Sequence, residues 1–342
     1  MTLRSGDNFL SSLDDGRTVW FNGKRVESIT DHPELSPIAQ TVADVYDLHH
    51  NPKLAPQLTC TLETGRTISA SYRPLDSREA IAERRQTIDF WARRSGGVAG
   101  RLPDYQAIIN SGLHDMRQVL AAGNPQWADN ISNWFEMVRD HDLLQTHAFA
   151  DAPRDRSRPE ADPGYLKIVE RRADGIIING AKSIATIAPI ADEFLGLTSP
   201  RPNIQADEVL FFAVPMNSEG LHIICRDSLI PRHIVGRPLS PHWDELDAYI
   251  IFNKVWVPNE RIFHLQEEGP VDLAALGQMF FGIINWALWH ILARATTKLE
   301  VLLGLANSLA DHLGKRQDPA VIATLAQMAI HLESVDALLF RA

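Results

Sequence analysis

Four clusters of polar side chains, each set among glycines and prolines, hold the residues of this 342-residue chain whose types could do chemistry. Arginine, histidine, serine and threonine in such turns suit the recognition of anions and hydroxyl groups. On composition alone, however, each cluster is more typical of a solvated turn. The clusters span residues 101–105, 142–157, 180–189 and 230–245.

Familiar catalytic and cofactor motifs are missing from the sequence. The glycine-rich stretch 96–100 follows no predicted strand, so it is not a dinucleotide fingerprint, and residues 180–183 lack the spacing of a phosphate loop. His141, Asp142 and His147 match no metal-ligand template. Two cysteines are too few for an iron–sulfur cluster or a cysteine-bound zinc. We therefore expect no metal, no iron–sulfur cluster and no NAD site.

Charge and cysteine usage narrow the class of protein. Asp and Glu total 43 against 33 Lys and Arg, so the net charge of −10 gives no general attraction to nucleic acid or an anionic membrane. Cys60 and Cys225 lie far apart, which suits a reduced, cytoplasmic protein. No secretory signal is visible at the N-terminus. Residues 276–293 are mostly apolar but include His290, so we expect a buried helix there and no membrane partner.

The first 142 residues are predicted to form a helical domain with small hairpins. Asn22-Gly23, between residues 18–21 and 24–26, is the strongest short hairpin signal in a sequence. A Ser-Pro pair suits an N-cap followed by the first helical residue, and a glycine suits a helix end. Helices are therefore expected to begin at Ser36-Pro37 with Ser36 as N-cap, to run from Ser77 to Gly96, and to begin near Gln126.

Residues 143–268 are predicted to form a compact antiparallel β domain, either a barrel or a sandwich. Turn signals join two pairs of apolar runs, 165–169 with 176–178 and 209–214 with 221–225, and residues 248–257 form a third strand-rich stretch. From residue 269 the pattern is helical, as expected for a C-terminal bundle. The predicted fold class is therefore α+β, with helical, β and helical regions in that order.

The end of the sequence, residues 331–342, is still helix-periodic and carries no capping glycine or asparagine. We therefore expect the chain to be truncated within its C-terminal bundle. In that case the apolar side chains of Leu338, Leu339 and Phe340 should lack partners.

Several motifs, in this order, resemble the 4-hydroxyphenylacetate 3-hydroxylase family, the oxygenase components of two-component flavin monooxygenases. The resemblance covers the whole chain and implies an acyl-CoA-dehydrogenase-like fold, in agreement with the α, β, α order. Phe9 stands where relatives often have tyrosine. The motifs are Arg4-Ser5-Gly6 with residues 10–33, Arg101-x-Pro103-Asp104-Tyr105, Thr146-His147-Ala148, Asp155-Arg156-Ser157, Gly180-Ala181-Lys182, Ala185-Thr186 and residues 255–263.

Membership of this family would imply a monooxygenase that uses reduced FAD (FADH2) and O2. The oxygen would reach a phenolic substrate through a flavin C4a-hydroperoxide, because the cofactor carries the difficult chemical step. A separate NAD(P)H-dependent flavin reductase would supply the reduced flavin. The family also implies a homo-oligomer, either a dimer or a tetramer.

The resemblance also assigns roles to individual residues. His147 matches the family's histidine at the phenol oxygen, and Arg101 with Tyr105 matches the substrate-loop pair. Thr198 and Ser199 lie near the segment that receives the substrate tail. The residues implied to line the flavin are Thr146, Ala148, Pro153, Arg154, Asp155, Arg156, Ser157 and Thr186, with Arg154 or Arg156 meeting the pyrophosphate.

A basic stripe and three alternatives stay open. His290, Arg294 and Lys298 recur every four residues, so they either face flavin phosphate or a neighbouring subunit, or form a solvated helix face. A flavin dehydrogenase or a dehalogenating oxygenase on the same fold, or a non-catalytic scaffold, could also explain the sequence. The related 4-hydroxybutyryl-CoA dehydratase is excluded because two cysteines cannot hold its iron–sulfur cluster.

Overall fold

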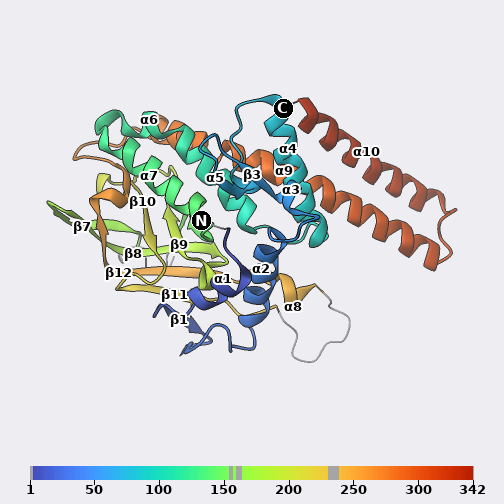
Figure 1. Ribbon diagram of the computed structural model, residues 1–342, viewed down its shortest axis with the longest axis horizontal. Helices are drawn as coiled ribbons and strands as arrows, with labels where there is room; N and C mark the ends of the chain where they lie inside the picture. The colour runs from blue at the N-terminus through green and yellow to red at the C-terminus, as the bar shows by residue number, and fades with distance from the viewer. Residues whose placement is uncertain (1–2, 154–156, 159–163, 230–238, 342) are drawn as a thin grey trace.

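The structure, a computed structural model, describes residues 3–153, 157–158, 164–229 and 239–341, with side chains as far as residue 339 at the C-terminal end. Two β-sheets lie on the left of Figure 1, with α6 and α7 above them and α9 and α10 extending as a hairpin to the right. The described part therefore has the predicted order of helical, β and helical regions. It contains no closed barrel.

The first region is mainly helical, and its local signals act largely as predicted. Asn22-Gly23 makes the turn of an antiparallel hairpin, and Ser77 caps its helix by accepting a hydrogen bond from the Ala80 N–H. The expectation for Ser36 was wrong, because Ser36 is already helical and Leu35 is the N-cap. The elements are α1 (Gly6–Ser12), β1 (Thr18–Phe21), β2 (Lys24–Arg25), α2 (Ser36–Leu48), α3 (Ala55–Leu58), β3 (Thr59–Thr61), β4 (Thr67–Ser69), η1 (Ala70–Tyr72), α4 (Arg78–Arg94), α5 (Pro103–Asp115), α6 (Arg117–Leu120), η2 (Ala121–Gly123) and α7 (Gln126–Asp140).

The β region contains parts of two sheets. A seven-stranded sheet has the order β2-β1-β11-β12-β8-β6 with β7 also paired to β8, and a four-stranded sheet has the order β13-β10-β9-β5. Most pairs are antiparallel, whereas β1–β11 and β5–β9 are parallel. The strands are β5 (Gln145–Ala148), β6 (Ala150–Asp151), β7 (Lys167–Arg172), β8 (Gly175–Thr186), β9 (Glu193–Gly196), β10 (Leu210–Pro215), β11 (Leu221–Cys225), β12 (Asp247–Pro258) and β13 (Ile262–Leu265), with η3 (Ala188–Ile190), η4 (Ala206–Glu208), α8 (Ser240–Trp243) and η5 (Asn259–Arg261) between them.

One predicted strand pair is wrong. Strands β10 and β11 follow each other in sequence, but β10 pairs with β9 and β13 while β11 pairs with β1 and β12. The chain thus crosses from one sheet to the other between them. The β7–β8 hairpin is confirmed. Strands β1 and β2 from the first region join the large sheet, and the domain boundaries 142/143 and 268/269 stay predictions.

The alternation of side chains along β10 divides the core into two. Phe212 points into the space between the sheets, where its ring and that of Phe194 contact Phe252 of β12, with centroids 5.8 and 5.4 Å apart. The neighbouring Phe211 belongs to the cluster shared with the helices. Because successive residues of a strand face opposite sides, the small sheet is buried on both faces. It is the rigid layer on which the site is built.

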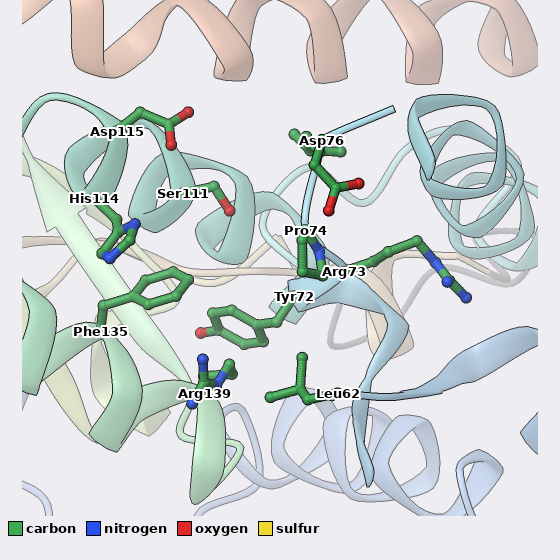
Figure 2. A pocket seen from close by; sticks show the side chains of 11 residues that line it. Leu62, Tyr72, Arg73, Pro74, Asp76, Ser111, His114, Asp115, Phe135 and Arg139 are labelled. Atoms are coloured by element: carbon green, nitrogen blue, oxygen red, sulfur yellow. The ribbon is translucent and has the colours of Figure 1, made fainter. Parts of the chain in front are cut away.

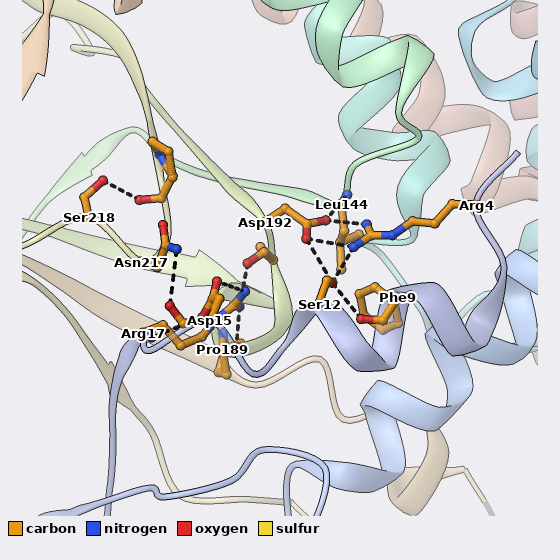
Figure 3. Close-up of polar contacts among 12 residues, drawn as sticks. Arg4, Phe9, Ser12, Asp15, Arg17, Leu144, Pro189, Asp192, Asn217 and Ser218 are labelled. Carbon is orange, nitrogen blue, oxygen red and sulfur yellow. Dashed lines mark hydrogen bonds and ion pairs between the residues drawn. The ribbon is translucent and has the colours of Figure 1, made fainter. Parts of the chain in front are cut away.

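The N-terminal segment ties two site-bearing segments together (Figure 3). Arg4 donates to both carboxylate oxygens of Asp192 at 2.6 and 2.9 Å, and Asp192 accepts a hydrogen bond from the backbone N–H of Leu144 at 2.8 Å. Nearby, Arg17 is fixed by Asp15 and donates to the carbonyl of Pro189 at 3.0 Å. Leu144 directly precedes β5, so this network fixes the strand that carries His147.

Helices α9 (Leu273–His312) and α10 (Pro319–Arg341) form the C-terminal region. Both are long and apolar enough to cross a membrane by length and composition, but α9 packs against α4 and α5 of the protein body. Leu338 is 69% exposed, as expected, whereas the expectation for Leu339 was wrong because it is buried beside Ile88 and Ala293. The side chain of Phe340 lies outside the described part.

Candidate active site

His147 lies on β5, between two aromatic rings in the interior of the protein. Its side chain is buried, and its Nδ1 atom lies 2.7 Å from Oε1 of Gln106 on α5. The ring centroids of Tyr105 and Phe149 lie 5.8 and 4.3 Å from that of His147. Phe149 in turn meets Phe280 of α9 edge to face. The imidazole is thus flanked by the ring of Tyr105 from α5 and the ring of Phe149, which directly follows β5.

Burial controls the protonation of this histidine. The pKa of His147 is lowered from 6.5 to about 3. The main cause is the loss of hydration on burial, and the second is the positive charge of Arg101. The imidazole is therefore neutral at physiological pH. A neutral imidazole has one donor nitrogen and one acceptor nitrogen, so His147 can accept a hydrogen bond from a substrate hydroxyl.

The predicted substrate-loop pair lies beside His147. The guanidinium of Arg101 stacks over the Tyr105 ring, 4.1 Å from its centroid, and Tyr105 is buried in the first turn of α5. The Glu245 carboxylate accepts hydrogen bonds from the backbone N–H groups of Gly100 and Arg101, at 2.9 and 2.6 Å. Burial raises the pKa of Glu245, while these two donors lower it. The loop therefore presents a cation next to a neutral base.

The basic stripe on α9 faces the same loop. His290 is buried, so the solvated-face interpretation is wrong for it, and its Nε2 lies 2.8 Å from Oδ2 of Asp104. Its ring also meets Tyr105 edge to face at 5.2 Å. Arg294 donates to the carbonyl of Ala99 at 2.9 Å, whereas Lys298 is exposed. Two of the three stripe residues thus hold the loop that carries Arg101.

Two of the residues predicted to line a flavin are brought together. Thr146 donates from Oγ1 to the carbonyl of Thr186 at 2.7 Å, which joins β5 to the end of β8. Thr186 donates to Asp247 at 2.6 Å, and Ala148 is buried on β5. Pro153 is exposed beyond β6. Ser157 is exposed as well, while Arg154, Asp155 and Arg156 lie outside the described residues.

The backbone beside Thr186 adopts an unusual conformation. Ile184 and Ile187 have φ of 61° and 66°, in the left-handed region that β-branched residues rarely occupy. Such conformations cluster at ligand sites. Ile184 is also 65% exposed, although it is large and apolar. The strained backbone thus exposes an apolar side chain two residues before Thr186.

The two residues predicted at the substrate tail make different contacts. The hydroxyl of Thr198 is buried and bonds backbone groups of Glu208 and Leu210, within 3.1 Å. Ser199 donates to the carbonyl of Phe149 at 3.0 Å. Since the ring of Phe149 packs against His147, the structure links Ser199, and not Thr198, to the site.

A cavity of about 430 Å³ opens beside the C-terminal end of α5, where Ser111, His114 and Asp115 line it (Figure 2). Aromatic Tyr72 and Phe135 form one wall, and Arg73, Asp76 and Arg139 add charge. Sequence reasoning missed this cavity because its residues come from several separate segments. It also missed the buried amides that connect Tyr72 to His147. Gln106 and Asn110, four residues apart within an apolar helix, were the available signal.

Among the described residues, no group of three or more His, Cys, Asp or Glu side chains could hold a metal ion. Cys60 and Cys225 are free thiols. They belong to separate hydrophobic clusters, one on the helical side and one between the sheets.

Comparison with known proteins shows what this arrangement is similar to. A family model described as 4-hydroxyphenylacetate 3-hydroxylase N terminal matches residues 5–264, and the corresponding C-terminal model matches residues 277–342. The FADH2-dependent monooxygenase TftD of Burkholderia cepacia is 32% identical over 96% of this chain and 65% of its own length. The oxygenase component of 4-hydroxyphenylacetate 3-monooxygenase from Thermus thermophilus is 32% identical over 99% of this chain and 70% of its own.

Solved structures give the same result for the fold. The oxygenase component HpaB of 4-hydroxyphenylacetate 3-monooxygenase, complexed with FAD, has a TM-score of 0.89 and 29% identity. That superposition covers 99% of this chain and 71% of the other. The chain therefore spans about two thirds of the length of the relatives it matches. It has the acyl-CoA-dehydrogenase-like fold and belongs to the 4-hydroxyphenylacetate 3-hydroxylase family.

Proposed function

We propose that this chain is the oxygenase component of a two-component flavin monooxygenase that hydroxylates a phenolic ring. One atom of O2 enters the ring and the other leaves as water, with two electrons supplied by reduced FAD. A separate NAD(P)H-dependent flavin reductase regenerates the reduced flavin. The observation that carries the proposal is a neutral, buried His147 held between Tyr105 and Phe149, with the cation of Arg101 beside it.

The residues around β5 and β8 fit a flavin. Ile184, two residues before Thr186, exposes an apolar side chain, and the hydroxyl oxygens of Thr146 and Thr186 can still accept hydrogen bonds from a ring N–H. Ala148 adds a small buried side chain, and the segment 153–157 would hold the phosphates. Bound reduced FAD would supply the activation of oxygen and its delivery to the ring.

The phenolic substrate would be bound by the side chains around His147. A phenol has a pKa near 10, and its phenolate is the better nucleophile. A buried imidazole with a pKa near 3 is a weak base, so His147 would accept a hydrogen bond from the phenol rather than take its proton outright. Arg101 would stabilise the developing negative charge on the oxygen. Tyr105 would pack against the ring, and Ser199, with Thr198, would lie toward the tail.

The test measures coupling, which is the amount of hydroxylated product per flavin oxidised. His147→Ala should lower hydroxylation by roughly 10²- to 10⁴-fold, while reduced flavin still reacts with O2 and hydrogen peroxide is released instead. Arg101→Gln should mainly raise KM for the phenol. A panel of 4-hydroxyphenylacetate, a chlorophenol and unsubstituted phenol would identify the substrate class.

A matched control separates this role from a structural one. His49 is also buried and hydrogen-bonded, to Tyr46 and Ser69, but lies at the C-cap of α2. His49→Ala should lower the melting temperature and leave coupling unchanged. Full coupling in His147→Ala would end its catalytic assignment, and no hydroxylation of any phenol by the wild type would end the proposed function.

We also propose a cytoplasmic homo-oligomer, a dimer or tetramer, without nucleic-acid or membrane partners. Exposed apolar side chains at the end of α9, Leu305 and Leu309 within the helix and Leu313 at its C-cap, support assembly, and the net charge of −10 argues against anionic partners. Light scattering of the purified protein at several concentrations tests this, and a monomer at every concentration would contradict it.

A further inference from the structure

A chain of buried amide groups leads away from His147 through the protein. Gln106 and Asn110 come from α5, Gln145 from β5, and Tyr72 from η1, and all four are almost fully buried. Gln106 Oε1 lies 2.7 Å from Nδ1 of His147, and Gln106 Nε2 lies 3.4 Å from Oδ1 of Asn110. The chain crosses from the site to the wall of the cavity that Tyr72 lines.

The remaining links fix the far end of the chain. Asn110 Nδ2 lies 2.5 Å from Oε1 of Gln145 and 3.3 Å from the hydroxyl of Tyr72. The Tyr72 hydroxyl lies 3.1 Å from the same Gln145 oxygen, and Nε2 of Gln145 bonds the backbone carbonyl of Leu143. Every polar group in the chain is therefore within reach of a defined neighbour.

The carbonyl of Leu143 sets the direction of all these bonds. A carbonyl oxygen can only accept, so Gln145 must present its NH2 group there and its oxygen to Asn110. Asn110 must then donate to Gln145 and present its own oxygen to Gln106. An amide rotated by 180° anywhere in the chain would place two acceptors, or two donors, face to face in a buried site.

The same donor and acceptor argument applies to the last hydrogen bond, between Gln106 and the imidazole of His147. Gln106 donates to Asn110, so its Oε1 faces His147 and accepts, and Nδ1 of a neutral His147 must carry the proton. We infer that Gln106, oriented by Asn110 and Gln145, is a positioning residue that fixes His147 as the Nδ1–H tautomer and leaves Nε2 as the acceptor for the substrate hydroxyl. The first half of this inference concerns the chain alone, and the second half rests on the proposed function.

The first experiment reads the tautomer directly. Histidine labelled with ¹⁵N in this 342-residue chain, with and without FAD, would give separate ¹⁵N shifts for Nδ1 and Nε2 of His147. The resonance is assigned by its loss in His147→Gln. Nδ1 should be the protonated nitrogen in the wild type throughout pH 5–8. A proton on Nε2 instead would overturn the inference without any variant or activity assay.

Two substitutions then separate positioning from simple packing. Gln106→Leu removes the acceptor and should give a mixture of tautomers, with kcat for hydroxylation reduced roughly 10- to 100-fold and KM nearly unchanged. Gln106→Glu keeps an acceptor at the same place, so it should restore the Nδ1–H tautomer. Its carboxylate should also raise the pKa of His147, which would add an acid limb to the pH profile of kcat.

A control variant tests whether any buried amide would have these effects. Asn130 is buried on α7 and donates to the carbonyls of Asn259 and Ile262, away from His147. Asn130→Leu should lower stability but keep the wild-type ¹⁵N shifts. A wild-type tautomer in Gln106→Leu would refute the positioning role. If the tautomers behave as expected but no phenol is hydroxylated, the positioning role stands and the proposed function fails.

Discussion

Acidification should destabilise the protein through His147, and the size of the effect follows from its burial. The pKa of His147 is about 3 in the folded protein and 6.5 as its ordinary value. Folding thus lowers the pKa of His147. The contribution of this residue to the free energy of unfolding is fully present above pH 6.5 and is lost as the pH falls toward 3. At pH 5 the unfolded chain has gained a proton that the folded chain still refuses. The 1.5 units between pH 6.5 and pH 5 correspond to about 2 kcal/mol of lost stability.

The assay compares urea unfolding of the wild type and His147→Gln at pH 8 and pH 5, followed by tryptophan fluorescence and by circular dichroism. Coincident transitions with the two probes would justify a two-state analysis. The wild type should lose about 2 kcal/mol more than His147→Gln between the two pH values. His141→Gln, which removes an exposed imidazole four residues before β5, controls for the substitution itself. Parallel pH dependences for the wild type and His147→Gln would refute the lowered pKa.

Four further results are expected. Gly97→Ala should raise KM for the phenol more than Gly96→Ala, because both glycines have positive φ but only at Gly97 would a Cβ lie within 3 Å of Lys298. Glu245→Ala should also raise KM and lower the unfolding free energy by about 1–3 kcal/mol, measured by steady-state kinetics and urea unfolding, since two backbone N–H groups lose their acceptor. Asp192→Ala should cost about 3 kcal/mol in urea unfolding, because it leaves the mostly buried Arg4 unpaired. The purified protein with FAD alone should not oxidise NADH, and rapid NADH consumption would contradict the need for a reductase.

Sequence signals predicted where helices and strands form better than they predicted which strands pair with each other. The turn at Asn22-Gly23 and the cap at Ser77 act within a few residues, so the chain specifies them locally. The alternation in β10 and β11 identifies two strands, but it carries no information about which strand each one pairs with. Their assignment to different sheets depends on packing between segments far apart in the sequence, such as the contact of Phe212 with Phe252.

The same contrast between local signals and long-range packing holds for the candidate site. The order of motifs pointed to Arg101, Tyr105 and His147, and the structure brings these three residues together. The spacing of His290 and Arg294 showed that they share a face of α9, yet spacing alone could not show that this face meets the loop at residues 97–104. The strong lowering of the pKa of His147 was also invisible, because it arises from burial in the folded protein and from the charge of Arg101, 46 residues earlier in the sequence.

The loop that carries Arg101 is held from two sides, and this has a consequence for substrate choice. From the helical side, His290 bonds Asp104 and Arg294 bonds the carbonyl of Ala99. From the side of the β region, Glu245 holds the backbone of Arg101. His147, in contrast, is positioned by Gln106 and the small sheet. Arg101 thus depends on contacts from α9 and Glu245, whereas His147 has its hydrogen bond from Gln106, so substitution of Arg294, which holds the loop through the carbonyl of Ala99, should alter substrate affinity more than the orientation of the imidazole.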